Sequence, residues 1–311
     1  MSVQTTVFIP CWLKLASLER AIRALLEQDE PFSLWVFLQG ARLAGPRGDR
    51  LEVELAKQSY TSPEFKEPVA FLRELTRKQR LGPMREIKLE LSRENLGLGA
   101  AKARALAGCE TPYLLSLDDD VLLEKDALAR LLESMRTHSK AGMISADLPK
   151  RHYGHWEFAK RLPSGKMVFR QRLTSRFTRG GQSGPRLVQV QWCYTGATLI
   201  RKAVYPQVNF DPAYFLGWED WDFCQQLLSS GWKIFVDRAA RAWEPPELAE
   251  PRDPKLKEAY RALRWDQEVL SRSLARFESK WFAIEGHDRW RASENANREA
   301  GAPRFQARAR T

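Results

Sequence analysis

The sequence of 311 residues predicts an α/β protein with a mainly parallel central sheet, helices on both faces of the sheet and a helical C-terminal extension. Three observations lead to this prediction. Short apolar runs typical of buried strands alternate with helical patterns in the first half of the chain. Turn-forming or acidic residues end these runs. After Pro245-Pro246 the pattern is helical from Pro254 to about Lys280.

Each element of the first half has its own signal. The first helix is expected to begin with Ser17 as its N-cap, and a later helical stretch breaks where Ser62 can cap a new helix with Pro63 in its first position. Strands are predicted over residues 7–10, 34–38, 86–91, 113–117 and 143–145. Helices are predicted over residues 17–28, 49–80 and 125–138. A further short helix is predicted to follow the glycine-rich turn and to end at residue 106.

The pattern changes between residues 150 and 186 to short, basic pieces interrupted by glycine. These pieces are expected to form hairpins and a mobile loop, with residues 180–185 as the most flexible stretch. Beyond Arg291 the chain is Arg-rich and is expected to be loose. Regular structure is predicted between these two regions, with strands over 187–192, 197–200 and 233–236 and helices over 219–231 and 254–280.

Three adjacent carboxylates, Asp118-Asp119-Asp120, end the apolar run of residues 113–117. They repel one another, so a fold that places them at the end of a strand needs a compensating cation. Because alternate residues of an extended segment point the same way, Asp118 and Asp120 can share one target while Asp119 faces elsewhere. Carboxylate oxygens suit Mg²⁺ or Mn²⁺ bound together with substrate phosphates. The alternative is an acidic turn that caps the helix starting near Glu124.

Two further segments carry candidate site residues. The glycine-rich turn 94–102 would lead from a strand into a helix whose N-terminus favours an anion, and Lys102 could reach a phosphate or a carboxylate. The segment 210–222 places Glu219 and Asp220 between large aromatic residues, an arrangement suited to holding a sugar ring and accepting a proton from its hydroxyl. Capping of a helix N-terminus is the alternative for these acids.

Charge and composition restrict the partners and the compartment. The net charge is +11, and ten basic residues against one acid fall between Lys150 and Gln189, interleaved with aromatic residues. This mixture suits a polyanion whose rings can stack, or else it is a solvated basic hairpin. The four cysteines form no CxxC pair, no apolar run reaches about 18 residues, and the N-terminus lacks a secretory pattern. A cytoplasmic protein, with contact to a membrane surface left open, is expected.

The motifs together resemble the family-2 inverting glycosyltransferases of the GT-A fold. The resemblance spans about residues 5 to 245 and rests on motifs in the family's order: residues 7–10, Asn95-x-Gly97, Leu117–Asp120, Gly196-Ala197, and Gly217–Asp222 with Gly231. It implies a Rossmann-like domain over residues 1–250, with a donor half at 1–147, a basic acceptor-side segment at 148–190 and a catalytic half at 191–250. Residues 251–311 would form the helical, Arg-rich extension.

The resemblance also implies a mechanism. Asp118 and Asp120 would hold Mn²⁺ or Mg²⁺ on the diphosphate of a nucleotide-sugar, and Asp220, with Glu219 beside it, would take the proton of an acceptor hydroxyl that inverts the anomeric carbon. The remaining residues expected at the donor are Pro10, Cys11, Trp12, Gln39, Asn95, Gly97, Lys102, Asp119, Gly196, Ala197 and Trp218. Residues expected at the acceptor are Trp156, Arg170, Arg172, Arg176, Tyr194, Trp218 and Trp221.

Two departures from the family pattern affect these expectations. An acid-rich turn that usually grips the nucleoside is here Gln39-Gly40-Ala41-Arg42. Many members carry a metal-binding histidine after the last strand, where this chain has Trp243-Glu244, so Glu244 is expected as the third ligand.

The acceptor stays open between two anionic classes. One is an envelope glycan or glycolipid at a membrane surface, and the other is a hydroxylated base in DNA or RNA. A catalytically silent GT-A binding protein is a more remote alternative, against which Asp118, Asp120 and Asp220 argue.

Overall fold

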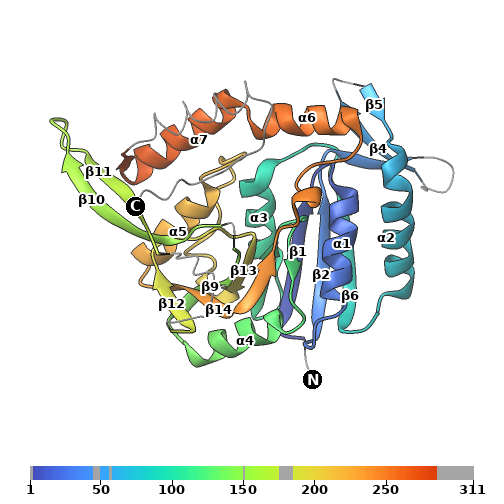
Figure 1. Ribbon diagram of the computed structural model, residues 1–311, viewed down its shortest axis with the longest axis horizontal. Helices are drawn as coiled ribbons and strands as arrows, with labels where there is room; N and C mark the ends of the chain where they lie inside the picture. The colour runs from blue at the N-terminus through green and yellow to red at the C-terminus, as the bar shows by residue number, and fades with distance from the viewer. Residues whose placement is uncertain (1–2, 45–49, 56–57, 150, 175–184, 286–311) are drawn as a thin grey trace.

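The computed structural model describes residues 3–44, 50–55, 58–149, 151–174 and 185–285. Among these residues, nine strands form the central sheet, eight of them in the order β12-β14-β9-β13-β7-β1-β2-β6, and β8 pairs with β14 (Figure 1). The strands are β1 (Thr5–Cys11), β2 (Phe32–Leu38), β6 (Met84–Leu91), β7 (Tyr113–Leu117), β8 (Leu122–Leu123), β9 (Ala141–Asp147), β12 (Leu187–Val190), β13 (Ala197–Arg201) and β14 (Lys233–Trp243).

The sheet is parallel in one half and mixed in the other. β7, β1, β2 and β6 run parallel to one another, and β9 runs parallel to β14. β13 is antiparallel to both β7 and β9, and β12 is antiparallel to β14. The predicted α/β class with a mainly parallel sheet and C-terminal helices is confirmed.

Two apolar cores lie on opposite faces of this sheet, because successive strand residues point to opposite sides. In β1, Val7 and Ile9 join the first core and Phe8 joins the second. The first core packs under α1 (Leu15–Leu25), α2 (Lys66–Lys78) and α4 (Ala127–Thr137). The second packs under α3 (Gly97–Gly108) and α5 (Glu219–Ser229).

Two predictions for the first half of the chain are wrong in part. Residues 50–55 and 58–60 are not helical but form β4 (Arg50–Leu55) and β5 (Gln58–Tyr60), which pair with each other and, through β4, with β3 (Ala41–Ala44). Leu51 and Val53 are buried at a spacing of two, the period of a strand. Ser17 lies inside α1 and donates its hydroxyl to the Leu248 carbonyl at 2.8 Å, so it is not the N-cap. Ser62 does accept from the Glu64 N–H at the start of η1 (Pro63–Phe65).

The C-terminal part covers one edge of the molecule. The helical stretch divides into α6 (Pro254–Arg264) and α7 (Gln267–Lys280), each begun by an aspartate whose side chain accepts two backbone N–H groups. The two helices lie end to end along the top of Figure 1. Short 3-10 turns occur at η2 (Lys202–Val204) and η3 (Pro246–Leu248). Within the described residues, no helix combines the length and apolar character needed to cross a membrane.

The basic segment contains the expected hairpin, made of β10 (Gly154–Arg161) and β11 (Met167–Leu173). β11 also pairs with the short strand β15 (Ala283–Ile284), which ties the hairpin to the end of α7. Nearly all of the stretch expected to be most flexible, and the Arg-rich segment beyond residue 291, lie outside the described residues.

Candidate active site

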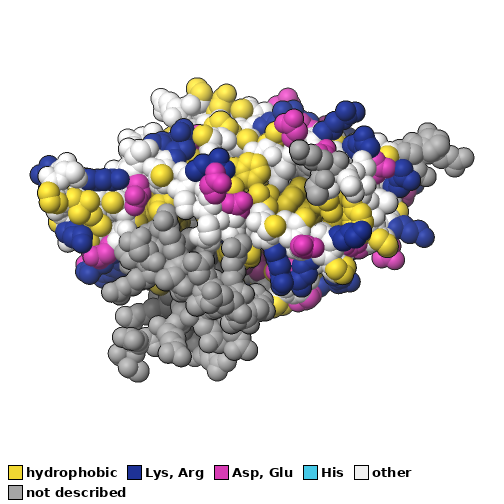
Figure 2. Space-filling model, turned by 90° about the horizontal axis from the view of Figure 1, so that it is seen from above, with side chains coloured by type: hydrophobic (Ala, Val, Ile, Leu, Met, Phe, Trp, Pro, Cys, Tyr) yellow, Lys and Arg dark blue, Asp and Glu magenta, His cyan; other side chains and the backbone are white. Residues whose placement is uncertain are grey.

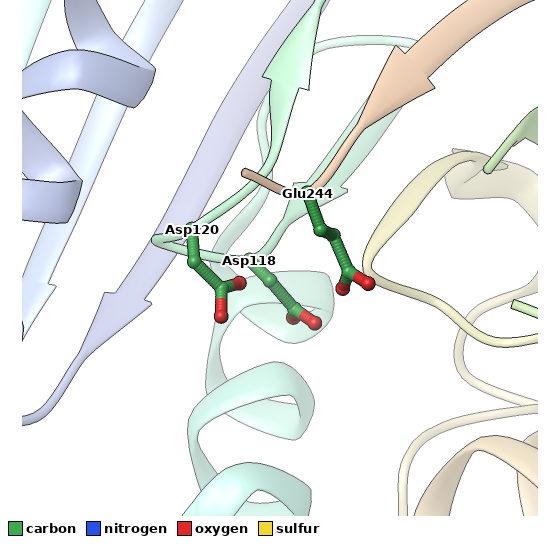
Figure 3. Close-up of side chains that lie close together, drawn as sticks. All are labelled: Asp118, Asp120 and Glu244. Atoms are coloured by element: carbon green, nitrogen blue, oxygen red, sulfur yellow. The ribbon is translucent and has the colours of Figure 1, made fainter. Parts of the chain in front are cut away.

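Three carboxylates that follow two separate strands meet at one edge of the central sheet. Asp118 and Asp120 follow β7, and Glu244 follows β14. β14 reaches this edge because its last residues pair with Leu122 and Leu123 of β8, just after the aspartate triplet. One oxygen of each carboxylate lies within 4.8 Å of the other two, and the side chains lie next to one another in Figure 3. Together they form a candidate site for a hard divalent cation.

Lys14 is a cation at this edge that the sequence-based prediction missed. Its Nζ lies 2.7 Å from Asp119 Oδ1 and 2.7 Å from Asp120 Oδ2, and it is buried with them. Burial raises the pKa of Asp119 to about 6, in spite of the nearby ammonium. For Asp120 burial acts in the same direction, but the Lys14 charge outweighs it and the pKa is lowered. Cys11 is buried beside Asp119, and both burial and this charge raise the pKa of its thiol.

Arg151 is the second cation that was not anticipated. Its guanidinium donates to both oxygens of Glu244, with the shortest contact, from Nη2 to Oε1, at 2.6 Å. The Arg151 guanidinium also lies 5.2 Å from the centre of the Tyr194 ring. Part of the compensating charge that the aspartate triplet requires is therefore supplied by the chain itself.

A cavity of about 120 Å³ opens beside these acids. The expected donor residues in its lining are Pro10, Trp12, Gln39, Asn95, Gly97, Asp118 and Asp119. The C-terminal extension, which had been given no role, contributes Tyr260, Leu263 and Arg264 from α6. The rings of Trp12 and Tyr260 lie 6.2 Å apart and form an aromatic wall of the cavity. Expected donor residues outside the lining are Cys11, Lys102, Gly196, Ala197 and Trp218.

The start of α3 does not present free N–H groups to an anion, contrary to the interpretation of the glycine-rich turn. Leu98 N and Gly99 N donate to the carbonyls of Phe215 and Tyr214 at 2.8 and 3.0 Å. Leu96 N donates to the side-chain oxygen of Gln39 at 3.0 Å. The glycines permit this contact, since a Cβ at Gly97 or Gly99 would lie 2.3 or 2.4 Å from a backbone oxygen. The glycine-rich turn therefore connects the start of α3 with the segment that precedes α5.

Gly196 and Ala197 lie at the start of β13, directly against the aspartate triplet. The Gly196 carbonyl accepts from Asp118 N at 2.8 Å, and a Cβ at Gly196 would lie 2.5 Å from Asp118 Oδ2. Glycine at this position leaves room for the Asp118 carboxylate. Ala197 is buried in the core and pairs with Leu117.

The acids of α5 form a second, buried cluster with Lys102. Lys102 Nζ lies 2.9 Å from Asp220 Oδ1, 3.3 Å from Glu219 Oε1 and 2.8 Å from Thr195 Oγ1. The Thr195 hydroxyl donates to the same Asp220 oxygen. Of the two partners expected for Lys102, a phosphate or a carboxylate, the structure shows carboxylates, those of Glu219 and Asp220.

Lys102 Nζ and the Thr195 hydroxyl both bind Asp220 Oδ1, and the Thr195 backbone also forms a hydrogen bond with this carboxylate. Burial opposes ionisation of Asp220, but the Lys102 charge and the Thr195 hydrogen bond outweigh it and lower the pKa. Burial and the neighbouring Asp220 raise the pKa of Glu219. Lys102 and Thr195 thus hold Asp220 as an ionised carboxylate.

The expected acceptor residues divide into two groups. Trp218 and Trp221 flank Asp220 in the sequence, and their rings meet edge to face at 4.4 Å, with Tyr194 6.4 Å from Trp221. Trp156 is partly buried and packs among aromatic rings, with its ring centre 5.4 Å from that of Trp221. Arg170 and Arg172 are exposed on the hairpin, away from this cluster, and Arg176 lies outside the described residues.

Comparisons with known proteins agree with this geometry. Residues 73–205, which include the aspartate triplet but not Asp220 or Glu244, match the sequence model of glycosyl transferase family 2. A crystal structure of GalNAc-T7 with UDP, GalNAc and Mn²⁺ is 13% identical, with a TM-score of 0.51, over 78% of this chain and 44% of that one. A crystal structure of S. aureus TarS 1-349 is 13% identical, with a TM-score of 0.50, over 89% of this chain and 72% of that one. No protein among the curated sequences matches the chain.

The fold is therefore that of the GT-A glycosyltransferases. Within this class, residues 73–205 are similar to glycosyl transferase family 2. The chain spans 36% of the longer S. aureus TarS structure, which is also 13% identical over 78% of this chain, with a TM-score of 0.48.

Proposed function

We propose that the protein transfers a sugar from a nucleoside diphosphate-sugar to a hydroxyl group of an anionic acceptor, with inversion at the anomeric carbon and with a divalent cation. The observation that carries the proposal is the cavity at the edge of the sheet. It is bordered by aromatic residues, among them Trp12 and Tyr260, and by the carboxylates of the aspartate triplet. This combination suits a nucleoside and its charged diphosphate in one pocket.

The carboxylates fit the divalent cation that the fold family implies. Asp118, Asp120 and Glu244 offer three oxygens within 4.8 Å of one another, which suits Mn²⁺ or Mg²⁺. When bound, such a cation supplies counter-charge to the diphosphate. Lys14 and Arg151 would have to release Asp120 and Glu244 to make these oxygens available, and each could then face the diphosphate instead. The GalNAc-T7 structure, of the same fold, contains Mn²⁺ and UDP.

Asp220 acts as the general base in this proposal. Its carboxylate takes the proton of the acceptor hydroxyl, the hydroxyl oxygen forms the bond to the anomeric carbon, and the bond from that carbon to the diphosphate breaks. A single displacement of this kind inverts the anomeric carbon. Lys102 and Thr195 bind Oδ1 and orient the carboxylate. Trp218 and Trp221 would border the acceptor sugar.

A glycan or glycolipid is favoured over a nucleic acid as the acceptor. The aromatic residues of the basic segment were expected to stack on a polyanion, and one of them, Trp156, instead packs against the rings of Trp192 and Phe282. This packing weakens the argument for stacking on nucleic acid bases, whereas the basic charge of the segment suits either anionic acceptor.

Measurements of nucleotide binding test two parts of the proposal together, the divalent cation and the nucleotide pocket. Calorimetric titration with UDP, GDP, CDP, ADP and dTDP is expected to show one nucleotide that binds at least about tenfold more tightly with Mn²⁺ than with EDTA, a difference of about 1.4 kcal/mol. Asp120→Asn should abolish the difference. Equal affinity in Mn²⁺ and EDTA, together with loss of binding in Lys14→Met, would assign the diphosphate to the lysine and contradict the cation.

Gly196→Ala should weaken cation binding by Asp118, although Gly196 itself is not expected to be a cation ligand. The added methyl group must displace the Asp118 carboxylate, so we expect the Mn²⁺-dependent part of nucleotide binding to fall at least about tenfold, by about 1.4 kcal/mol. Nucleotide affinity in EDTA provides the internal control, since it should change little. Unaltered Mn²⁺ dependence would show that Asp118 is not a ligand.

A further inference from the structure

The β10–β11 hairpin extends from the body of the protein at the end remote from α2, as Figure 1 shows. Its inner part is anchored, because Phe169 and Trp156 pack on Phe282 with ring centres 4.5 and 5.0 Å away. The pairing of Val168 with Ala283 fixes it further. Residues 158–167, which include the turn, form the free end of this anchored element and are called the hairpin tip here.

The hairpin tip exposes large apolar side chains. Phe158 is 54% exposed and Met167 is 49% exposed, and Leu173, on the same hairpin, is 48% exposed. These are three of the five large apolar residues that the described chain leaves exposed. Exposed apolar side chains gathered on one projecting element are typical of an interaction surface.

The hairpin tip is also cationic. It contains Lys160, Arg161 and Lys166 and no acidic residue. Lys160 and Arg161 form no ion pair with the described residues, and Lys166 is only loosely paired, 3.8 Å from Glu278. Figure 2 shows apolar and basic side chains together at the hairpin's end of the molecule. The cations are therefore available to an external anion.

We propose that the hairpin tip docks the protein on the surface of an anionic lipid bilayer. Phe158 and Met167 would enter the boundary between headgroups and acyl chains, while Lys160, Arg161 and Lys166 contact anionic headgroups. A nucleic acid would use the same cations but would leave Met167 in water. A bilayer accounts for both the charge and the apolar exposure of one short segment.

The location of the hairpin links this surface to the proposed reaction. Trp156 of β10 contacts Trp221, the residue after Asp220, with ring centres 5.4 Å apart. The identity of the acceptor, unlike the docking surface itself, rests on the proposed sugar transfer. With that transfer, the acceptor would be the headgroup of an anionic lipid or a lipid-linked glycan at that surface.

Co-sedimentation of the full chain with lipid vesicles tests the docking surface without any measurement of sugar transfer. We expect binding to phosphatidylcholine vesicles that contain phosphatidylglycerol, little binding to pure phosphatidylcholine, and weaker binding as salt increases. Each basic residue near an anionic surface contributes about fivefold in affinity, so Lys160→Gln/Arg161→Gln should weaken binding about 25-fold. Phe158→Ser/Met167→Ser should weaken it at least about tenfold without altering its salt dependence.

The matched control is Arg77→Gln/Lys78→Gln on α2, which removes the same charge at the opposite end of the molecule. Vesicle binding that falls equally in the control and in the tip variants would overturn the proposal, because it would reflect net charge alone. Tip variants that lose binding to single-stranded DNA but keep vesicle binding would assign the surface to nucleic acid instead. Nucleotide binding measured on the same variants reports separately on the donor site.

Discussion

Asp220→Asn is expected to reduce sugar transfer by about 10²- to 10⁴-fold while nucleotide affinity stays nearly unchanged. The amide cannot accept the proton of the acceptor hydroxyl, yet it can still accept hydrogen bonds from Lys102 and Thr195. Initial rates with the donor identified by calorimetry, followed by release of the nucleoside diphosphate, measure the effect. The loss should appear in kcat, because the carboxylate acts on the reacting hydroxyl and not on the donor.

A carboxylate elsewhere serves as the control for this substitution. Asp126→Asn removes a carboxylate that is 43% exposed and pairs with Arg130, and it should leave transfer unchanged. An Asp220→Asn variant that retains more than about a tenth of wild-type kcat would assign the base to another residue.

Lys102→Met is expected to lower the free energy of unfolding by about 3–5 kcal/mol. Removing one partner of a buried ion pair leaves the other charges uncompensated, and here Glu219 and Asp220 lose the only ammonium that contacts them among the described residues. Urea denaturation followed by tryptophan fluorescence measures the change.

Two further variants separate this effect from a loss of packing. Lys88→Met removes an exposed lysine that lies 3.5 Å from Glu90, and it should change the free energy of unfolding by less than about 1 kcal/mol. The triple variant Lys102→Met/Glu219→Gln/Asp220→Asn should recover much of the lost stability, since no uncompensated charge is left. A triple variant as unstable as Lys102→Met would show that the lysine acts through its packing.

The pH dependence follows from the directions of the pKa shifts. The pKa of Asp220 is lowered in the folded protein, so its contribution to stability is present above its unfolded value and is lost as pH falls through the folded value. The pKa of Lys102 is raised, because the charges of Asp220 and Glu219 outweigh its burial, so its contribution is present below its unfolded value and is lost as pH rises through the folded value. The effect of Lys102→Met should therefore be largest near neutral pH. In that variant the acid limb of kcat should move to higher pH, because Asp220 loses the cation that keeps it ionised.

The sequence by itself determined the α/β class and the position of the aspartate triplet. Apolar runs such as residues 113–117 predict buried strands because their side chains must leave water on both faces of a parallel sheet. The spacing of Asp118 and Asp120 predicts that they share a target, since alternate residues of an extended chain point the same way. Both inferences concern residues that are close in the sequence, so they can be made from the periodicity of the sequence alone. Residues 50–55 were predicted to be helical but form a strand. Their apolar residues alternate as in a strand, but several of the residues are also good helix formers, which favoured the wrong prediction.

The ion pairs between distant segments could be identified only from the three-dimensional structure. Lys14 contacts Asp120 across 106 positions of the sequence, and Lys102 contacts Asp220 across 118. A lysine near a turn carries no local signal for such a partner, since ion pairing depends on distance in space and on burial, and both arise from the packing of separate elements. For the same reason Tyr260 and Arg264 of α6 could not be assigned to the pocket, because the periodicity of a helix does not specify which strand ends it will cover.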